Sequence, residues 1–454
     1  MNHCSEYSGH FNVHGWDSSA HARHYLSGLL GTQRRKNIGR IGEDIEASNY
    51  QGMQQFVSDS PWDHTALMRQ LAGEANGLLG GHRDSALYID ETSFVKKGSN
   101  SVGVQRQYCG RLGKTENCQV GVFASLGRGE RAALVDYRLF LPEVWAGDEQ
   151  RCQKAKVPPA QRVHRTKCEL ALDMVKEAIK NNMRHEWIGA DEVYGNNHAF
   201  ADALEQLGQI YLMDVASNLL VWESQPEASA SHARNKLKHN QESVSQLAAR
   251  HFEKQSRLVT QRQTTRGPKR VRLWVRRVWV WDGTKQDSVR ARLLIVRREA
   301  DGTHKYSLSN APADTPWERL GHMQGQRYFI ERAFEDGKSE LGMAHYEVRS
   351  WRGWHHHMAL CCLAHLFCLK ERIGYKQEHP LLSARDIVEL LAYYLPRRNR
   401  TEQGVLAAMQ ARHAARQKDI RRRLLAAQSP APPAPRSRGK NATKPRVVPK
   451  KLTK

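Results

Sequence analysis

Two apolar segments of this sequence each end in an aspartate. The segment LYIDETSF (87–94) carries Asp90 after an apolar run, and WIGADEVYG (187–195) carries Asp191 in the same setting. Acidic residues are depleted inside strands, so a carboxylate at the end of a buried strand needs a reason. It can bind a hard cation such as Mg²⁺, or it can cap the helix or turn that follows. Taken singly, each aspartate leaves both interpretations open.

The surrounding sequence is typical of a mixed β-sheet covered by helices. Strand-like segments come first, and strands and helices then alternate. The predicted strands are 85–94, 102–110, 118–126, 133–142, 186–195 and 210–216, and the predicted helices between them are 168–182 and about 197–207. The predicted fold class is therefore α/β, a mixed sheet flanked by helices.

Residues 217–305 interrupt this alternation. They begin with a polar, Ser- and Gln-rich stretch at about 223–265 and continue into RLWVRRVWVWDG (272–283), which alternates apolar and basic residues. A partner strand, VRARLLIVRRE (289–299), follows a turn that suits a hairpin. We predict a β-rich insertion with a small sheet of its own.

The chain is strongly basic. Its 454 residues include 70 Lys and Arg against 47 Asp and Glu, a formal charge of +23. This excess favours a polyanionic partner such as DNA, RNA or an acidic membrane surface. No stretch is long and apolar enough to span a bilayer, and the first residues lack an apolar signal core, so a cytoplasmic protein is expected. The eight cysteines include no CxxC pair and are expected to be reduced thiols.

A predicted helix presents a third carboxylate between two cations. In QRYFIERAFEDGK (326–338), Arg327, Glu331 and Lys338 stand at positions 0, +4 and +11. At about 100° per residue, the three side chains fall within about 40° of one another on one helix face. A row of surface ion pairs would also explain this spacing.

Taken in order, these features resemble the DDE transposases of bacterial insertion sequences, which have a ribonuclease-H-like fold. In that family the first aspartate lies on the first strand in an Asp-x-Thr context, as Asp90 does, and the second ends the fourth strand, as Asp191 does. In one subgroup the glutamate has Arg four residues before it and Lys seven after it, as Glu331 has. That subgroup also carries a β-rich insertion before the glutamate. The resemblance covers roughly residues 20–395.

The resemblance implies that Asp90, Asp191 and Glu331 bind two divalent ions, Mg²⁺ or Mn²⁺, about 3.5–4 Å apart. Water would attack a phosphodiester at the end of the element, and the freed 3′-hydroxyl would attack the opposite strand or target DNA. Arg327 and Lys338 would bind phosphate oxygens. The implied function is cut-and-paste transposition by a nucleoid-associated protein that acts on terminal inverted repeats and target DNA, as a homodimer in the synaptic complex.

The sequence departs from the subgroup signature at one position. The tyrosine expected three residues before the arginine is Gln324 here, and Tyr328 follows the arginine instead. A role of that tyrosine toward the DNA backbone is therefore not carried over. The block KKGSNSVGVQRQYCG (96–110) also resembles this family, and we assign its Lys97 and Arg106 to DNA binding.

These expectations divide the chain into six regions. They are a helical N-terminal DNA-binding region (1–82), the first part of the catalytic domain (83–216), the β-rich insertion (217–305), the second part of the catalytic domain (306–375), a helical C-terminal region (376–428) and a basic tail (429–454). The tail is rich in Pro, Lys and Arg and lacks acidic residues, so we expect it to be disordered.

Other carboxylates compete for the same role. Glu91 and Glu192 each follow one of the chosen aspartates, but their side chains are expected to point to the opposite face of the strand. Glu335, one helical turn after Glu331, is the stronger alternative. The spacing to the neighbouring arginine and lysine favours Glu331.

Tryptophans and arginines are interleaved in the insertion. Trp279 and Trp281 share one face of the predicted strand, and Trp274 faces the other way. Aromatic and basic side chains together can hold an unstacked base beside a phosphate, so we assign Trp279 and Trp281 to DNA binding. Packing within the sheet is the alternative, and Trp222 is a further candidate.

Histidines and basic clusters suggest further contacts. His355, His356 and His357 are consecutive, so their side chains splay apart on a helix; with His365 they are expected to be polar helix positions or DNA contacts rather than metal ligands. The basic residues considered for DNA binding are Arg34, Arg35, Lys36, Arg40, Arg421, Arg422 and Arg423.

Two other functions remain open. One is a different nuclease with the same fold, but such enzymes are usually shorter and lack the long insertion. The other is a catalytically silent, transposase-derived protein that acts as a DNA-binding or regulatory protein. The presence of all three carboxylates favours the active enzyme without proving activity.

Overall fold

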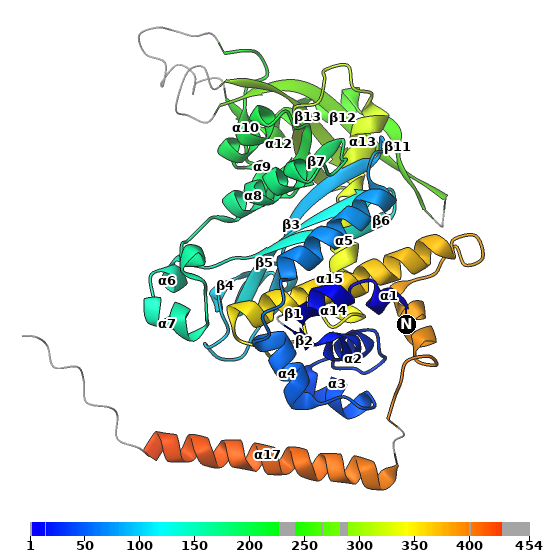
Figure 1. Cartoon of the computed structure of the whole chain (residues 1–454). Helices are drawn as coiled ribbons and strands as arrows, with labels where there is room; N and C mark the ends of the chain where they lie inside the picture. Colours follow the sequence, from blue (N-terminus) through cyan, green and yellow to red (C-terminus); the bar gives the residue numbers. More distant parts are fainter. Residues whose placement is uncertain are drawn as a thin grey trace, which may run out of the picture. The chain divides into compact units, whose positions relative to one another are not determined.

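The computed structural model describes residues 2–13, 15–226, 241–264, 267–281, 289–398 and 401–428. The chain divides into two compact units, residues 1–398 and residues 399–454. The first unit holds the sheet and the helices around it (Figure 1), and the second holds the helix α17 (Glu402–Gln428). The predicted disordered tail lies outside the described residues.

Five strands form the centre of a mixed sheet. β3 (Ser85–Val95) pairs antiparallel with β5 (Lys114–Arg128), which pairs antiparallel with β6 (Arg131–Leu139). On the other side of β3, β7 (Trp187–Ala190) and β8 (Tyr211–Val215) continue the sheet as parallel strands. β3 therefore lies between β5 and β7, in the interior of the sheet.

Helices make the crossovers that parallel strands require. α8 (Lys167–Lys180) leads into β7, and α9 (Glu192–Gly195) and α10 (His198–Gln206) join β7 to β8. Thr166 begins α8 with a capping box, because its side chain accepts from the Glu169 amide while Glu169 accepts from the Thr166 amide. The mixed α/β fold predicted from the sequence is confirmed.

The hairpin predicted for the insertion belongs to the main sheet, so that part of the prediction is wrong, while β9 (Leu220–Val221) and β10 (Glu242–Ser243) form a separate two-stranded sheet. β11 (Arg257–Thr264), β12 (Gly267–Val280), β13 (Arg290–Arg298) and β14 (His304–Ser309) pair in succession, and β14 pairs antiparallel with β8. With β4 (Gln105–Cys109), which pairs with β5, they complete one sheet of ten strands (Figure 1). Without β14, β8 would be an edge strand with unpaired backbone groups.

The insertion does have a hydrophobic core of its own. α12 (Val244–Gln255), a helix inside the stretch interpreted as polar, packs Leu247 and Phe252 against β12 and β13. Trp274 lies in this core, and its indole Nε1 donates to Gln255 Oε1 at 3.0 Å. The polar composition of this stretch hid the helix, because only one of its faces is apolar.

Helices from both ends of the first unit pack against the sheet at β6. The helices that contact β6 there are α5 (His64–Leu79), α14 (Tyr328–Ser339) and α15 (Trp351–Gly374). Two N-terminal helices, α2 (Ser19–Leu29) and α4 (Tyr50–Ser58), pack in turn on α15. A third, α3 (Ile38–Asp44), packs against α2 and α4. The start of the chain is thus part of the same hydrophobic core as the sheet.

The histidines of α15 are structural, and their predicted alternative role as DNA contacts is wrong. His355, His356, His357 and His365 are all buried. The imidazole of His356 stacks on Trp62, with its ring nitrogens 3.0 and 3.1 Å from the carbonyl oxygens of Val57 and Trp62. α15 is buried on all sides from Gly353 to Leu366, as expected of a helix between a sheet and other helices.

These histidines predict a loss of stability in acid. Burial lowers the pKa of His365 from 6.5 to about 4, so the folded state resists a proton that the unfolded chain accepts below pH 6.5. Between pH 7.5 and 5.5 this histidine alone should cost about 1.4 kcal/mol of folding free energy. Thermal unfolding at the two pH values should show a larger drop in Tm for the natural chain than for His365→Met. Equal drops would contradict the burial argument.

Candidate active site

Strand register places Asp90 and Asp191 side by side. Asp90 is the sixth residue of β3 and is buried. Ile89 on β3 pairs in parallel register with Ala190, the last residue of β7, so Asp191 follows at the level of Asp90. Side chains at the same level of two parallel strands point to the same face. Two aspartates separated by a hundred residues of sequence thus reach one point of the sheet.

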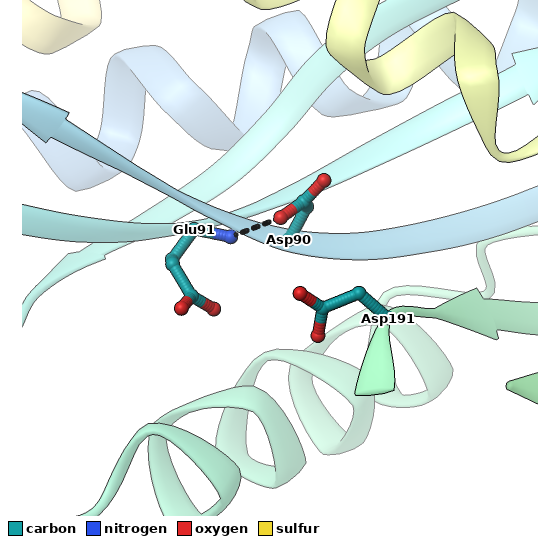
Figure 2. A group of neighbouring side chains, drawn as sticks. All are labelled: Asp90, Glu91 and Asp191. Carbon is teal, nitrogen blue, oxygen red and sulfur yellow. Dashed lines mark hydrogen bonds between the residues drawn. The ribbon is translucent and has the colours of Figure 1, made fainter. Parts of the chain in front are cut away.

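The two interpretations of Asp191 coexist. Asp191 is the N-cap of α9, and its Oδ1 accepts from the Val193 amide at 3.0 Å. Capping uses one oxygen and leaves the other for a cation. Asp90 caps no helix; its Oδ1 accepts from the backbone amide of Glu91 at 2.7 Å (Figure 2).

Glu91 is closer to this pair than the sequence suggested. Figure 2 shows Asp90 and Glu91 leaving β3 in different directions, with the Asp191 carboxylate turned toward both. One carboxylate oxygen from each of the three residues lies within 4.8 Å of the others. β7 ends beside Ile89, so no strand covers the edge of β3 beyond it, and Glu91 reaches across. Glu91 is already bound by Lys167 Nζ at 2.5 Å and Tyr194 Oη at 2.9 Å.

Glu331 is joined to the aspartates through Arg327. Glu331 is on the first turn of α14 and its side chain is 49% exposed. Arg327 lies between α13 (Trp317–Gln326) and α14, and its Nη1 is 2.9 Å from Glu331 Oε1 and 3.3 Å from Asp90 Oδ2. Within the described residues, Glu331 is not in the close group of Asp90, Glu91 and Asp191. Glu335 and Glu192 are exposed, and Glu335 pairs with Arg332.

The site holds more negative charge than its surroundings favour. Burial raises the pKa of Asp90 well above its usual range; Arg327 opposes this, while Asp191 and Glu91 add to it. Burial and the nearby Glu91 raise the pKa of Asp191 to about 6. A divalent cation would relieve both burial and repulsion, and the oxygen-only donor set is the kind that Mg²⁺ and Mn²⁺ prefer. The residues present therefore fit such an ion.

This charge predicts an unusual effect of neutralising Asp90. In EDTA, Asp90→Asn should raise the Tm, because it removes a buried, repelled carboxylate worth about 1 kcal/mol of destabilisation. Mn²⁺ should raise the Tm of the natural chain, since it binds the native state, and should leave the variant's Tm unchanged. Scanning fluorimetry in EDTA and in Mn²⁺, with the exposed Glu335→Gln as control, measures both. A variant less stable in EDTA, or one that responds fully to Mn²⁺, would show that Asp90 is not the buried ligand.

Lys338 lies against the strand that carries Asp90. Its Nζ donates to Thr92 Oγ1 at 2.5 Å and lies over the ring of Phe94. Burial, with a smaller effect of the nearby Arg111, lowers the pKa of Lys338 to about 8, and Asp90 opposes the shift. Of the predicted row, Arg327 and Lys338 thus contact β3, whereas Glu331 is half-exposed beside Arg327.

One carboxylate of this cluster was not predicted from the sequence. Asp214 on β8 accepts from Arg327 Nε at 3.2 Å and from Ser307 Oγ at 2.6 Å. Its segment, IYLMDVA, shows the same pattern as the segments of Asp90 and Asp191, an apolar run that ends in an aspartate. Applying that criterion to every predicted strand would have found it.

The remaining predicted DNA-binding residues lie elsewhere on the fold. Lys97 and Arg106 are exposed, the first just after β3 and the second on β4. Trp279 is half-buried on β12, with the Arg277 guanidinium 5.4 Å from its ring centre. Trp281 is half-buried and lies 6.2 Å from Trp222, between ring centres.

Three further candidates are buried, so the structure does not support them as DNA contacts. Trp222 is buried, and Trp274 is packed in the core of the insertion. Lys36 is also buried, and its Nζ donates to the carbonyl oxygens of Leu29 and Glu340. Arg34, Arg35 and Arg40 in the first unit are exposed, as are Arg421 and Arg422 of α17.

Two comparisons show which known proteins this chain resembles. A family model described as DDE superfamily endonuclease matches residues 11–268, which include Asp90 and Asp191. A protein of Microchaete diplosiphon described as "Probable transposase for insertion sequence element IS701" is 28% identical over 322 residues, 71% of this chain and 74% of the relative. No helix among the described residues is both long and apolar enough to cross a membrane.

Proposed function

Because this chain belongs to the DDE superfamily of endonucleases, whose catalytic domain is ribonuclease-H-like, we propose that it is the transposase of an insertion sequence and moves it by cut-and-paste transposition. The observation that carries the proposal is the convergence of Asp90 and Asp191 at one point of the sheet, with Arg327 linking Asp90 to Glu331. Such a cluster suits phosphoryl transfer, because it unites carboxylate ligands with a phosphate-binding cation.

Asp90, Asp191 and Glu331 are the residues that would bind the metal. Two Mg²⁺ or Mn²⁺ ions would supply Lewis-acid stabilisation of the attacking and leaving oxygens. Asp90 and Asp191 come from adjacent strands and are held rigidly by the sheet. Glu331 is more exposed and lies on a helix, so it would close the site from the side of α14.

The cations beside these carboxylates would hold the DNA backbone. The guanidinium of Arg327 offers parallel N–H donors that match two oxygens of one phosphate. Lys338, anchored by Thr92, would place a point charge on the neighbouring phosphate. Lys97, Arg106, Trp279 and Trp281 would contact DNA further from the scissile bond. The chain's net charge of +23 suits this long polyanionic substrate.

The substrates would be double-stranded DNA, first at the terminal inverted repeats and then at the target. Because two ends must be brought together, we propose that a homodimer forms the synaptic complex. A protein with these substrates would work on the nucleoid in the cytoplasm.

A cleavage assay tests this function. The purified chain is incubated with DNA carrying the element's end, in Mg²⁺ and in Ca²⁺, and the products are resolved on a denaturing gel. We expect strand cleavage at the end in Mg²⁺ and binding without cleavage in Ca²⁺. Specific binding without cleavage in Mg²⁺ would favour a regulatory DNA-binding protein, and cleavage without preference for the end would favour another ribonuclease-H-like nuclease.

A further inference from the structure

Asp214 has both carboxylate oxygens engaged. Oδ2 accepts from Arg327 Nε at 3.2 Å, and Oδ1 accepts from the Ser307 hydroxyl at 2.6 Å. The antiparallel register of β8 and β14 places Ser307 directly opposite Asp214. Asp214 therefore holds the arginine through one oxygen and is itself held by Ser307 through the other, and within the described residues it does not belong to the close group of Asp90, Glu91 and Asp191.

A buried glutamine extends the series of hydrogen bonds that begins at Asp214. Gln324 Nε2 on α13 donates to Ser307 Oγ at 2.8 Å, and both side chains are buried. Because the Ser307 hydroxyl gives its proton to Asp214, it must accept from Gln324, which fixes the orientation of the amide. Gln324 stands where the subgroup signature has tyrosine, and its side chain is buried against β14.

Asp214 differs from the other partners of Arg327. Nη1 of Arg327 contacts Asp90 and Glu331, which are the proposed metal ligands, whereas Nε contacts Asp214. A cation bound by Asp90 and Glu331 would compete with Nη1 for their oxygens. The contact between Nε and Asp214 does not involve those ligands, so it would remain and leave the outer edge of the guanidinium free for phosphate.

We propose that Asp214 is a positioning residue for Arg327 in DNA cleavage, held in place by Ser307 and Gln324. The inference rests on the proposed function and adds to it the group that orients the phosphate-binding arginine. It also links the site to the insertion, because Ser307 lies on β14, just after the insertion, and pairs with Ile295 on β13 of the insertion. Ser307 is opposite Asp214 only because β14 joins the main sheet.

A double-mutant cycle tests the proposal with two measurements. The proteins are Asp214→Asn, Arg327→Gln, their combination and the natural chain; Asp202→Asn is the matched control, since Asp202 pairs with a different arginine, Arg292. The first measurement is the Tm in EDTA without DNA. The second is the single-turnover rate of cleavage in Mg²⁺ at saturating DNA, with DNA affinity measured separately in Ca²⁺.

We expect Asp214→Asn to slow cleavage about 10- to 100-fold, the effect of a misplaced catalytic group, with DNA affinity nearly unchanged. In the Arg327→Gln background the same substitution should have no further effect on the rate. In EDTA the two substitutions should lower Tm less together than the sum of their separate effects, because they break one contact. Asp202→Asn should show no coupling with Arg327→Gln in either measurement.

The outcomes separate this inference from the proposed function. Equal slowing by Asp214→Asn in both backgrounds would overturn the positioning role, since Asp214 would then act independently of Arg327. Additive changes in Tm would overturn the contact itself. Absence of cleavage by the natural chain, with the coupling in Tm intact, would overturn the proposed function, and the catalytic part of this inference with it, while leaving the contact established. Ser307→Ala should slow cleavage and Ser307→Thr should restore it, which a merely space-filling role would not produce.

Discussion

Glu331→Gln is expected to abolish DNA cleavage, lowering the rate by at least about 10³-fold, while binding of end DNA in Ca²⁺ stays close to that of the natural chain. The amide keeps the size of the side chain but lacks the negative charge that a divalent ion needs. In the structure Glu331 is half-exposed and pairs with Arg327, so its loss should disturb the fold little. The rate is measured on DNA carrying the element's end, in Mg²⁺ and Mn²⁺.

Two matched variants make this a test of which glutamate is the third ligand. Glu335→Gln changes the next turn of the same helix, where the carboxylate pairs with Arg332 on the surface, and should retain the natural rate. Glu91→Gln removes the carboxylate nearest to Asp90 and Asp191; because Lys167 and Tyr194 already bind it, we expect a smaller loss, about 10-fold or less. If Glu91→Gln abolished cleavage and Glu331→Gln did not, the assignment of Glu331 would be wrong.

Arg327→Gln is expected to separate metal binding from catalysis. The rate of cleavage should fall about 10²- to 10³-fold, because the developing charge on the phosphate loses its bidentate partner. The affinity for Mn²⁺ should rise, because the guanidinium no longer competes for Asp90 and Glu331. Titration with Mn²⁺ in the absence of DNA and single-turnover cleavage with it measure the two effects.

Arg327→Lys is the informative comparison. It restores the charge but neither the planar fork nor the Nε contact with Asp214, so the rate should recover only in part. A weaker affinity of Arg327→Gln for Mn²⁺ would mean that the arginine organises the carboxylates for the metal, and its assignment to the phosphate would have to be abandoned.

The carboxylates of the site differ in how far local sequence predicts them. Asp90 and Asp191 could be found from the sequence because each ends an apolar run, and the signature around Glu331 could be found because its spacing is helical. Asp214 has the same local pattern as the aspartates, but no signature singled it out. Because successive side chains of a strand point to opposite faces, Glu91 was expected to point away from Asp90. β7 does not cover the edge of β3 beyond Ile89, so the long side chain of Glu91 reaches the two aspartates.

The insertion shows a second difference. Its strands β12 and β13 were predicted from alternating apolar residues, and the hairpin register agrees. That these strands belong to the main sheet was not predicted. The pairing of β14 with β8 depends on the free edge of β8, and the residues of the hairpin carry no record of that edge. The same holds for the histidines of α15, whose polar character suggested a surface and whose backbone partners exist only in the folded chain.

By itself, the sequence determined the mixed α/β class and most of its strands and helices through local periodicity, and through its resemblance to a family it predicted Asp90, Asp191, Arg327, Glu331 and Lys338 as site residues. The tertiary structure alone decided which of them lie together. It brought Asp191 level with Asp90 through the parallel register, and it brought β14 to the edge of β8, so that Ser307 and Asp214 could hold Arg327. Register and edge pairing join residues far apart in the chain, and no local pattern records such contacts.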